Sequence, residues 1–383
     1  MKSIFIIGST GSLGKEALEV IKKLGDYYKV IGITGFQNIG MILKQIKDFD
    51  PQYIGMKKNY LETIKKEFQG KYIFDVEKDL EKVVLDANAD LTLFLSSDIT
   101  ALKSIDLLLS CKKYVAIANK ESIIAGGGVI FSQDKQKYII PVDSELSALF
   151  QCLIGETKNA VKRFIITASG GPFWERDITT FDKITPSDAL HHPNWRMGKK
   201  ITVDSATLIN KAFEVIESHF FFGIDYGKIE VIVHRESIIH SMIEFVDGNT
   251  KALMSTPLMY FPLQYAITYP ERAINSFLES RLDLEKVGKL TFYPLDNNKF
   301  PGFLTALKYG KRGGNFLPIL IAMDKVLVDA FLKEMISFSD IPRLLEKGLS
   351  QFTYKKIDSV PDIVEVYKEG ILLSEEMIKR SVK

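Results

Sequence analysis

"SIFIIGSTGSLGKEALEVIKKLG", residues 3–25, begins with a short apolar run, continues through a loop with evenly spaced glycines, and ends in an amphipathic pattern. Its first five residues predict a strand that is buried on both faces. The apolar residues after the loop recur with a helical period, so a helix starts inside the glycine-rich segment. A strand, a glycine turn and a helix in this order are typical of the first unit of a parallel α/β sheet.

The glycine loop has the chemistry of a phosphate-binding turn. Gly8, Gly11 and Gly14 follow a GxxGxxG spacing, which lets the backbone turn tightly and approach a pyrophosphate at a helix N-terminus. Ser9, Thr10 and Ser12 add hydroxyl donors. The alternative is a tight strand-to-helix turn that binds no ligand.

The alternation of strands and helices continues along the first part of the chain. Short apolar runs separated by helical patterns occupy residues 28–34, 53–56, 72–75, 91–96, 114–119 and 138–143. This order predicts a mainly parallel, doubly wound sheet, whose ligands lie at the C-terminal ends of its strands.

The end of the second strand bears on which dinucleotide would bind. An acidic residue there usually holds the ribose 2′-hydroxyl of NAD. Here the strand ends in Thr34-Gly35-Phe36-Gln37-Asn38, without an acid. NADP is therefore favoured over NAD, although this segment supplies no Arg or Lys for a 2′-phosphate.

Composition excludes several classes of function. At 383 residues, two or three domains are expected. A net charge of +2 gives no drive toward nucleic acid or acidic membranes, and no apolar run is long enough to span a bilayer. The N-terminus lacks the features of a signal or transit peptide. Two cysteines in no spaced motif and five histidines argue against a Cys/His zinc site and favour a reduced, cytoplasmic setting.

Charged residues gather where two later strands end. "NKES", residues 119–122, would face the ligand crevice, or would be an ordinary polar connection. Asp143 and Glu145 follow the next strand and would point the same way if the chain stays extended, which suits a Mg²⁺ or Mn²⁺ site. The alternative is a helix start with Asp143 or Ser144 as its N-cap.

Two further segments suggest phosphate binding and a lid. Residues 169–172, Ser-Gly-Gly-Pro, form either a phosphate cradle or a plain turn. The loop at residues 191–198 carries His192 and Trp195 and has no helical period, so its Trp is suited to cover a ligand.

A helix is expected to start in residues 204–221, "DSATLINKAFEVIESHFF". Ser205, near its N-terminus, would join Asn210 and Lys211 in holding a phosphate, with Glu214 as a third metal ligand. The alternative is that Lys211 and Glu214 form an ordinary ion pair on an exposed helix face. The apolar residues around them leave little exposed face and argue against this alternative.

The motifs together resemble one family. "GSTGSLG", "NKES", "PVDSE", "SGGPF", "HPNWRMG" and "ITVDSAT..NK..E" occur in the order found in 1-deoxy-D-xylulose 5-phosphate reductoisomerases of the non-mevalonate isoprenoid pathway. The resemblance covers roughly the first two-thirds of the chain, and the last three motifs are long and specific.

The resemblance implies a cofactor site for NADPH. The residues concerned are Gly8, Thr10, Gly11, Ser12, Leu13, Gly35, Phe36, Gln37, Asn38, Asn119, Glu121 and Gly198. It also implies that Asp143, Glu145 and Glu214 bind one divalent metal, Mg²⁺ or Mn²⁺.

The remaining implied residues surround the substrate. The phosphate would be held by Ser169, Ser205, Asn210 and Lys211, and the hydroxylated backbone would be contacted by Lys120 and Ser144. His192, Trp195 and Met197 would form a flap over it. The catalytic candidates are Lys120, Asp143, Glu145, His192 and Glu214.

The implied reaction is the metal-dependent isomerisation and NADPH reduction of 1-deoxy-D-xylulose 5-phosphate to 2-C-methyl-D-erythritol 4-phosphate, in a cytoplasmic homodimer without nucleic-acid or membrane partners. One alternative is an NADP-dependent dehydrogenase of a small aldehyde, without rearrangement and without a metal requirement. Another is a nucleotide-binding relative that has lost catalysis.

The implied fold class is α/β, with four parts along the chain. A doubly wound, Rossmann-like domain is expected at 1–142, a central α/β catalytic domain at 143–268, a linker at 269–296 and a C-terminal helical bundle at 297–383. Helical patterns in the bundle begin near residues 303, 313, 339 and 359, and the third has Pro342 in its first turn and Gly348 at its end.

Several positions depart from the family pattern. Leu146 stands where His is common, and Phe36 and Gln37 replace the usual Gly or basic residue, so a smaller preference for NADPH over NADH is expected. The later departures are Leu258, Tyr260, Ile321, Asp324 and Lys325. They concern packing or dimer contacts more than chemistry.

Overall fold

The computed structural model describes residues 1–195, 197–274 and 277–381. Internal contacts divide the chain into two compact units. The first comprises Met1–Ser122, Ser132–Ser147 and Leu258–Arg281, and the second comprises Ile123–Phe131, Ala148–Pro257 and Leu282–Lys383. The α/β fold class is confirmed, while the four-part division along the chain stays a prediction.

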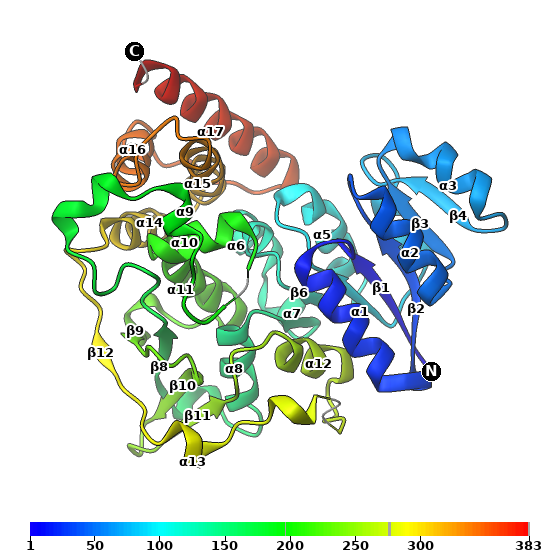
Figure 1. Cartoon of the computed structure of the whole chain (residues 1–383), viewed down its shortest axis with the longest axis horizontal. Helices are drawn as coiled ribbons and strands as arrows, with labels where there is room; N and C mark the ends of the chain where they lie inside the picture. The colour runs from blue at the N-terminus through cyan, green and yellow to red at the C-terminus, as the bar shows by residue number, and fades with distance from the viewer. Residues whose placement is uncertain (196, 275–276, 382–383) are drawn as a thin grey trace. The chain divides into compact units, whose positions relative to one another are not determined.

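A seven-stranded parallel sheet forms the centre of the first unit (Figure 1). Its strands are β1 Lys2–Ile7, β2 Tyr28–Thr34, β3 Tyr53–Met56, β4 Tyr72–Asp75, β5 Leu91–Phe94, β6 Val115–Ile117 and β7 Ile139–Pro141. Their order is β4-β3-β2-β1-β5-β6-β7. Successive strands run outward in one direction from β1 to β4 and in the other from β5 to β7. This reversal beside β1 is the switch point of a doubly wound sheet, and the glycine loop directly follows β1.

Helices connect these strands. They are α1 Ser12–Leu24, α2 Ile39–Phe49, α3 Leu61–Glu67, α4 Leu80–Asp86, α5 Leu102–Ser110, α6 Lys120–Ile130, α7 Gln133–Gln136 and α8 Ser144–Cys152, and a later helix, α12 Tyr260–Thr268, packs on α1. Ile4 and Ile6 of β1 and Ala17 and Val20 of α1 are fully buried in one apolar cluster. Burial of each large side chain contributes about 1.5–3 kcal/mol.

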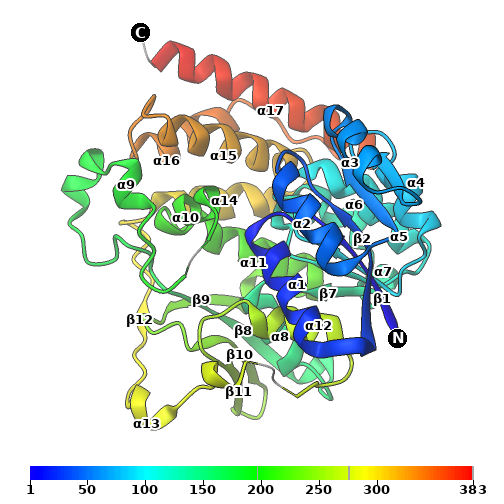
Figure 2. The ribbon, with the colours of Figure 1, turned by 45° about the vertical axis from the view of Figure 1, so that its right-hand side comes forward.

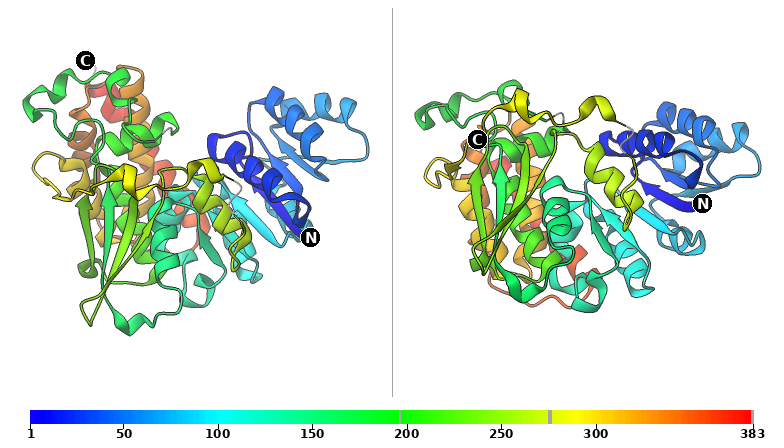
Figure 3. Two further views of the ribbon diagram at one scale, coloured as in Figure 1. Left: turned by 60° about the horizontal axis from the view of Figure 1, so that its bottom comes forward. Right: turned by 90° about the horizontal axis from the view of Figure 1, so that it is seen from below.

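The second unit contains a five-stranded mixed sheet (Figure 3). Its strands are β8 Val161–Ala168, β9 Ile229–Val233, β10 Ile239–Phe245, β11 Thr250–Met254 and β12 Tyr293–Pro294, in the order β11-β10-β8-β9-β12. Only β8 and β9 pair in parallel. The segment with α13 Leu284–Val287 leads to β12 at the sheet edge, so the predicted linker does contain a short strand.

The helix expected to start near residue 204 is divided in two. After α9 Pro186–Ala189, helix α10 spans Lys199–Ala206 and α11 spans Ile209–Phe222. Leu208 lies between them with φ +58° and is buried. The break was missed because apolar residues continue on both sides of it. Ser205 therefore lies at the end of α10 and not at the start of the helix that carries Asn210.

Four helices complete the second unit (Figure 2). They are α14 Pro301–Arg312, α15 Phe316–Leu332, α16 Asp340–Leu349 and α17 Val360–Ser381. Gly348 does not cap α16 as expected, because the helix continues through it; a Cβ there would lie 2.0 Å from Met323 Cε, so any larger residue would require that methionine side chain to move. Among the described residues, no helix combines the length and apolarity needed to cross a membrane.

Candidate active site

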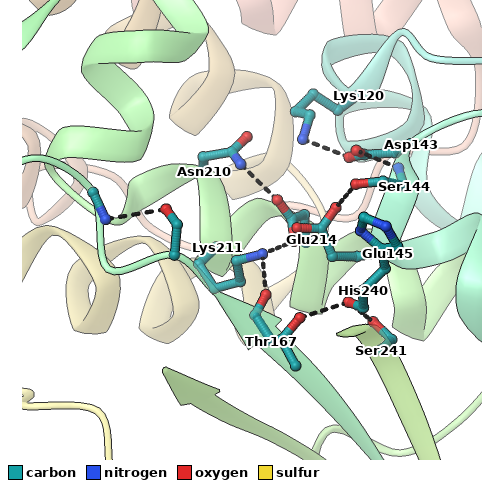
Figure 4. A network of polar contacts seen from close by, with 12 residues as sticks. Lys120, Asp143, Ser144, Glu145, Thr167, Asn210, Lys211, Glu214, His240 and Ser241 are labelled. Atoms are coloured by element: carbon teal, nitrogen blue, oxygen red, sulfur yellow. Dashed lines mark hydrogen bonds and ion pairs between the residues drawn. The ribbon is translucent and has the colours of Figure 1, made fainter. Parts of the chain in front are cut away.

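Three carboxylates form the core of the candidate site (Figure 4). Asp143 follows β7, Glu145 lies in the first turn of α8, and Glu214 lies in α11. One carboxylate oxygen from each is within 4.8 Å of the others. Asp143 Oδ1 accepts a hydrogen bond from Ser144 N at 3.0 Å, and its backbone carbonyl accepts one from Ser147 N. The segment from Asp143 to Glu145 is therefore the start of a helix, which was the alternative prediction, and the prediction of an extended chain there is wrong. The carboxylates nevertheless come together.

Cations and amides surround this cluster. Lys120 Nζ lies 2.7 Å from Asp143 Oδ2. Lys211 Nζ pairs with Glu214 Oε2 and donates to Thr167 O at 2.6 Å, while Asn210 Nδ2 donates to Glu214 Oε1. Lys120, Lys211 and Glu214 are buried. Two ammonium groups therefore offset part of the repulsion among three carboxylates. The donor set, oxygen atoms from three acids, fits Mg²⁺ or Mn²⁺ better than zinc.

The serine and glycine turn after β8 lies beside the end of α10. Gly170 and Gly171 have φ of +79° and +67°, and Gly171 N donates to Ser169 Oγ at 3.2 Å. A Cβ on Gly171 would lie 2.8 Å from Ser205 O, so the turn and Ser205 are in close contact. The structure thus brings together Ser169 and Ser205, which the sequence places on separate segments.

Arg235 is a residue of this region that the sequence analysis missed. Its guanidinium donates to Ser169 O and, at 3.0 Å, to Gly171 O. It fixes the turn by holding two carbonyls. A sequence signal that could have identified it is a basic residue two positions after the end of β9, the parallel neighbour of β8.

His192 anchors the candidate flap. Its Nδ1 lies 3.1 Å from Asn194 N and 3.0 Å from Trp195 N, and its Nε2 lies 3.1 Å from Ser169 Oγ. Backbone N–H groups can only donate, so Nδ1 accepts and the proton is on Nε2, facing Ser169. The flap and the Ser169 turn are therefore joined by a hydrogen bond.

Other contacts hold the same loop. Asn194 Nδ2 donates to Arg235 O at 2.7 Å and to Ser237 Oγ at 2.8 Å. The ring of Trp195 lies 6.1 Å from that of His240, a buried histidine that the sequence analysis also missed. These contacts hold residues 192–195 in place, although the sequence of the loop has no periodic apolar face. Met197 is half-buried, and Gly198 is the N-cap of α10; Arg196, inside the predicted flap, lies outside the described residues.

The glycine loop has the geometry that close approach requires. Gly8 has φ +86°, and a Cβ there would meet Ser96 N at 2.9 Å. A Cβ on Gly14 would lie 2.3 Å from Gly8 O. Gly11 is exposed, and no side chain caps the start of α1 behind it. Backbone donors at this helix N-terminus fit a pyrophosphate; Thr10 lies in the loop, and Ser12 and Leu13 are the first residues of α1. Ser9 is buried and its hydroxyl donates to Thr34 O and Gln45 Oε1, so it does not face a ligand as expected.

The end of β2 lies next to this loop. A Cβ on Gly35 would be 3.0 Å from Thr10 Cγ2. Phe36 and Gln37 are exposed, and Asn38 caps α2 through a hydrogen bond from Met41 N at 3.0 Å. Predicted cofactor residues from two strand ends are thus adjacent.

Asn119 and Glu121 lie at the start of α6 and are buried. Asn119 Nδ2 donates to Asp98 O at 2.6 Å, and its Oδ1 accepts from Ser122 N at 2.7 Å. These bonds fix the connection from β6 to α6.

The residues that depart from the family pattern have structural partners. Leu146 and Ile321 are buried in apolar surroundings, Leu258 is half-buried, and Lys325 is exposed. Tyr260 donates to Glu19 Oε2 at 2.9 Å and stacks on Phe277. Burial, together with the Glu19 carboxylate, raises the pKa of Tyr260 to about 12. Asp324 is fully buried and paired with Lys200.

Comparison with protein-family models gives three adjoining matches. A model described as 1-deoxy-D-xylulose 5-phosphate reductoisomerase matches residues 4–127. The model of that enzyme's C-terminal domain matches residues 139–222, and one described as DXP reductoisomerase C-terminal domain matches residues 254–370.

Curated proteins and solved structures agree with these matches. The chain is 42% identical over 388 residues to the 1-deoxy-D-xylulose 5-phosphate reductoisomerase of Sulfurihydrogenibium sp. strain YO3AOP1, with 99% of each chain covered. It is 39% identical to that of Chloroherpeton thalassium, with 96% and 95% covered. A crystal structure of DOX-P reductoisomerase with NADPH, fosmidomycin and magnesium matches with a TM-score of 0.91 at 29% identity, covering 99% of this chain and 98% of that one. The Zymomonas mobilis enzyme with NADPH matches at 0.89 and 30%, covering 98% and 99%.

Proposed function

Because this chain belongs to the 1-deoxy-D-xylulose 5-phosphate reductoisomerase family, we propose that Asp143, Glu145 and Glu214 hold the divalent metal of its reaction. That reaction uses NADPH and Mg²⁺ or Mn²⁺ to convert 1-deoxy-D-xylulose 5-phosphate to 2-C-methyl-D-erythritol 4-phosphate. The observation that carries the proposal is the convergence of three carboxylate oxygens within 4.8 Å. When bound, the metal supplies Lewis-acid stabilisation of the developing oxyanion, and NADPH supplies the hydride.

Lys120 and Ser144 are assigned to the substrate's oxygen atoms. Lys120 is the first residue of α6, and its buried ammonium lies beside Asp143. An ammonium in a site with little water stabilises negative charge on a neighbouring substrate oxygen more strongly than it would in bulk water. Ser144 Oγ donates to Glu145 Oε2, so the hydroxyl lies beside the metal-binding carboxylate and its lone pairs can accept from a substrate hydroxyl.

The substrate's phosphate is assigned to Ser169, Ser205, Asn210 and Lys211. Asn210 and Lys211 lie in the first turn of α11, where backbone N–H groups favour an anion. Both side chains bond Glu214 in the described structure. Engagement of Glu214 by a metal would weaken those bonds and allow the amide and ammonium to turn to the phosphate. Phosphate binding then supplies remote binding energy that orients the reacting carbons.

His192, Trp195 and Met197 are assigned to a flap that excludes water. The hydrogen bond between His192 and Ser169 joins the loop to the phosphate-binding turn, so phosphate binding and loop position are coupled. Water exclusion protects the aldehyde formed by rearrangement until it is reduced. Fosmidomycin, which occupies a solved relative, is proposed to bind in the same place.

The test is NADPH oxidation with 1-deoxy-D-xylulose 5-phosphate after treatment with a chelator, with and without added Mg²⁺ or Mn²⁺. Turnover that returns only with metal, with a branched carbon skeleton in the product by NMR, is the expected result. Metal-independent reduction of an unrearranged aldehyde would support the dehydrogenase alternative instead. NADPH binding without turnover would support the relative that has lost catalysis.

Assembly and location are further proposals. We infer a homodimer in the cytoplasm, because curated relatives that match over nearly their full length are biosynthetic reductoisomerases and the chain has no Cys/His metal motif or paired cysteines. Light scattering coupled to size exclusion tests the dimer, and a single species with the mass of one chain would contradict it.

A further inference from the structure

The ends of three neighbouring strands form a row beside the predicted adenosine loop. Thr34 of β2 is paired with Gly55 of β3, and Met56 of β3 is paired with Asp75 of β4. Phe36 and Lys57 each lie two residues beyond a paired position, so they are neighbours across the row. The strand register thus places a cation from β3 beside the β2 end, which has none of its own.

Contacts fix where this cation is. Lys57 Nζ lies 3.9 Å from the centroid of the Phe36 ring, as in a cation–π interaction. The Lys57 side chain is only 30% exposed, so its stem is packed and its ammonium is not free to sample all directions. Glu77, two residues beyond the end of β4, places a carboxylate 3.8 Å from the ammonium and is 54% exposed. A pair this exposed is weak and leaves the cation available to a stronger anion.

The position matches that of a ribose 2′-substituent. In doubly wound folds the residues after the second strand contact the adenosine ribose, and a nearby cation accommodates a 2′-phosphate. A Cβ on Gly35 would lie 2.8 Å from Met56 Sδ and 3.0 Å from Thr10 Cγ2. The end of β2 is therefore in contact both with the glycine loop and with the end of β3.

We propose that Lys57 recognises the 2′-phosphate of NADPH and replaces the basic residue that the end of β2 lacks. Phe36 acts as the platform that holds the Lys57 ammonium in place. This inference rests on the proposed function only in taking NADPH as the cofactor. A phosphate dianion with an ammonium forms a charge-assisted hydrogen bond, which is stronger than a neutral one.

The test compares binding of cofactors and of adenosine fragments. Affinities of the wild type and of Lys57→Met are measured by calorimetry for NADPH, NADH, adenosine 2′,5′-bisphosphate and AMP. Methionine keeps the packed stem over Phe36 and removes only the charge. Lys57→Met is expected to lose about tenfold to a hundredfold in affinity for the two 2′-phosphorylated ligands. NADH and AMP should bind within about twofold of the wild type, because they lack the group that Lys57 contacts.

Matched variants separate this role from general effects. Lys58→Met makes the same charge change at the next, exposed residue and should leave all four affinities unchanged. Lys57→Arg should retain binding of the 2′-phosphorylated ligands, and Glu77→Gln should tighten it by releasing the ammonium from its carboxylate. The dependence of NADPH affinity on salt concentration should be weaker in Lys57→Met than in the wild type, and this change should be seen in that variant alone.

The possible outcomes test the role of Lys57 separately from the assignment of NADPH as the cofactor. An unchanged ratio of NADPH to NADH affinity in Lys57→Met, or an equal loss for both cofactors, overturns the role of Lys57 while the proposed function stands. Failure of the wild type to bind NADPH, adenosine 2′,5′-bisphosphate or NADH would instead overturn the cofactor assignment itself.

Discussion

Glu214→Gln tests the three-carboxylate site most directly. Glu214 is 1% exposed, and its two oxygens bond Asn210 and Lys211. Glutamine has nearly the same shape and can still accept from Lys211, so the helix should keep its packing. The substitution removes one of three negative charges and one metal ligand.

The structure indicates how large the effects should be. Two unit charges 4.8 Å apart interact by about 3.5 kcal/mol at an effective dielectric constant of about 20. Without metal, the substitution relieves repulsion of about this size from each of the two neighbouring carboxylates, but it also loses the stronger attraction of the Lys211 ammonium, which is in direct contact with Glu214, so the two changes largely cancel. The free energy of unfolding of the metal-free protein should therefore change by no more than about 2 kcal/mol.

With metal, the two proteins should differ clearly. At a Mn²⁺ concentration about 100 times the wild-type dissociation constant, binding raises the wild-type free energy of unfolding by about 2.7 kcal/mol. If losing one ligand weakens binding about 100-fold, the variant gains only about 0.4 kcal/mol at the same concentration. Turnover should be abolished, whereas NADPH affinity should be preserved because the glycine loop is untouched.

The assays are calorimetric Mn²⁺ titration, denaturant unfolding with and without Mn²⁺, and NADPH oxidation. Glu217→Gln is the matched control, since Glu217 is also buried in α11, three residues further on, and is outside the carboxylate cluster. Equal Mn²⁺ affinity and near-normal turnover in Glu214→Gln would refute the metal assignment.

Three further predictions concern other parts of the molecule. Gly11→Val should fold normally, because Gly11 has an extended backbone and a Cβ there meets only Gly8 O at 3.4 Å, but NADPH affinity should fall by about tenfold or more; unchanged affinity would place the pyrophosphate elsewhere. Trp195→Ala should impair catalysis while leaving Mn²⁺ affinity intact, and Trp195 fluorescence in a Trp174→Phe background should respond to a phosphonate substrate analogue with metal; no spectral response together with full activity would mean that the loop is only structural. The pKa of Tyr260 is raised to about 12 in the folded state, so its neutral form is favoured there, and the stability it contributes should be present below pH 10 and lost as the pH rises toward 12; Tyr260→Phe should remove that component of the alkaline unfolding curve.

The strands of the parallel sheet were the part most open to prediction. β2, β3 and β4 have the predicted bounds, because each is a short apolar run enclosed by polar or turn residues. β5, β6 and β7 end earlier than the apolar runs suggested. At the ends of these three strands the chain leaves the sheet and places polar residues at the ligand-binding edge. The apolar residues that follow the strands are buried in loops, and the sequence does not distinguish them from residues of a strand.

The break between α10 and α11 could not be predicted from local pattern. Leu208 is apolar, buried and placed at helical spacing, yet its φ of +58° ends one helix and starts another. The roles of Arg235, His240 and Lys57 could not be predicted from local sequence pattern either. Each acts on a segment that is distant in sequence, so its role depends on strand order and register.

Asp324 shows how a residue that departs from the family pattern can have an oppositely charged partner in the fold. It is fully buried in α15 and pairs with Lys200, whose Nζ is also 2.7 Å from Asp204 Oδ2. An unpaired carboxylate there would cost several kcal/mol, so this aspartate requires that lysine. Lys200 lies in the first turn of α10, two residues after Gly198, the N-cap of that helix. Asp324 therefore adds a charge that joins α15 to α10, the helix that follows the flap, across 124 positions of sequence. No local pattern contains both partners.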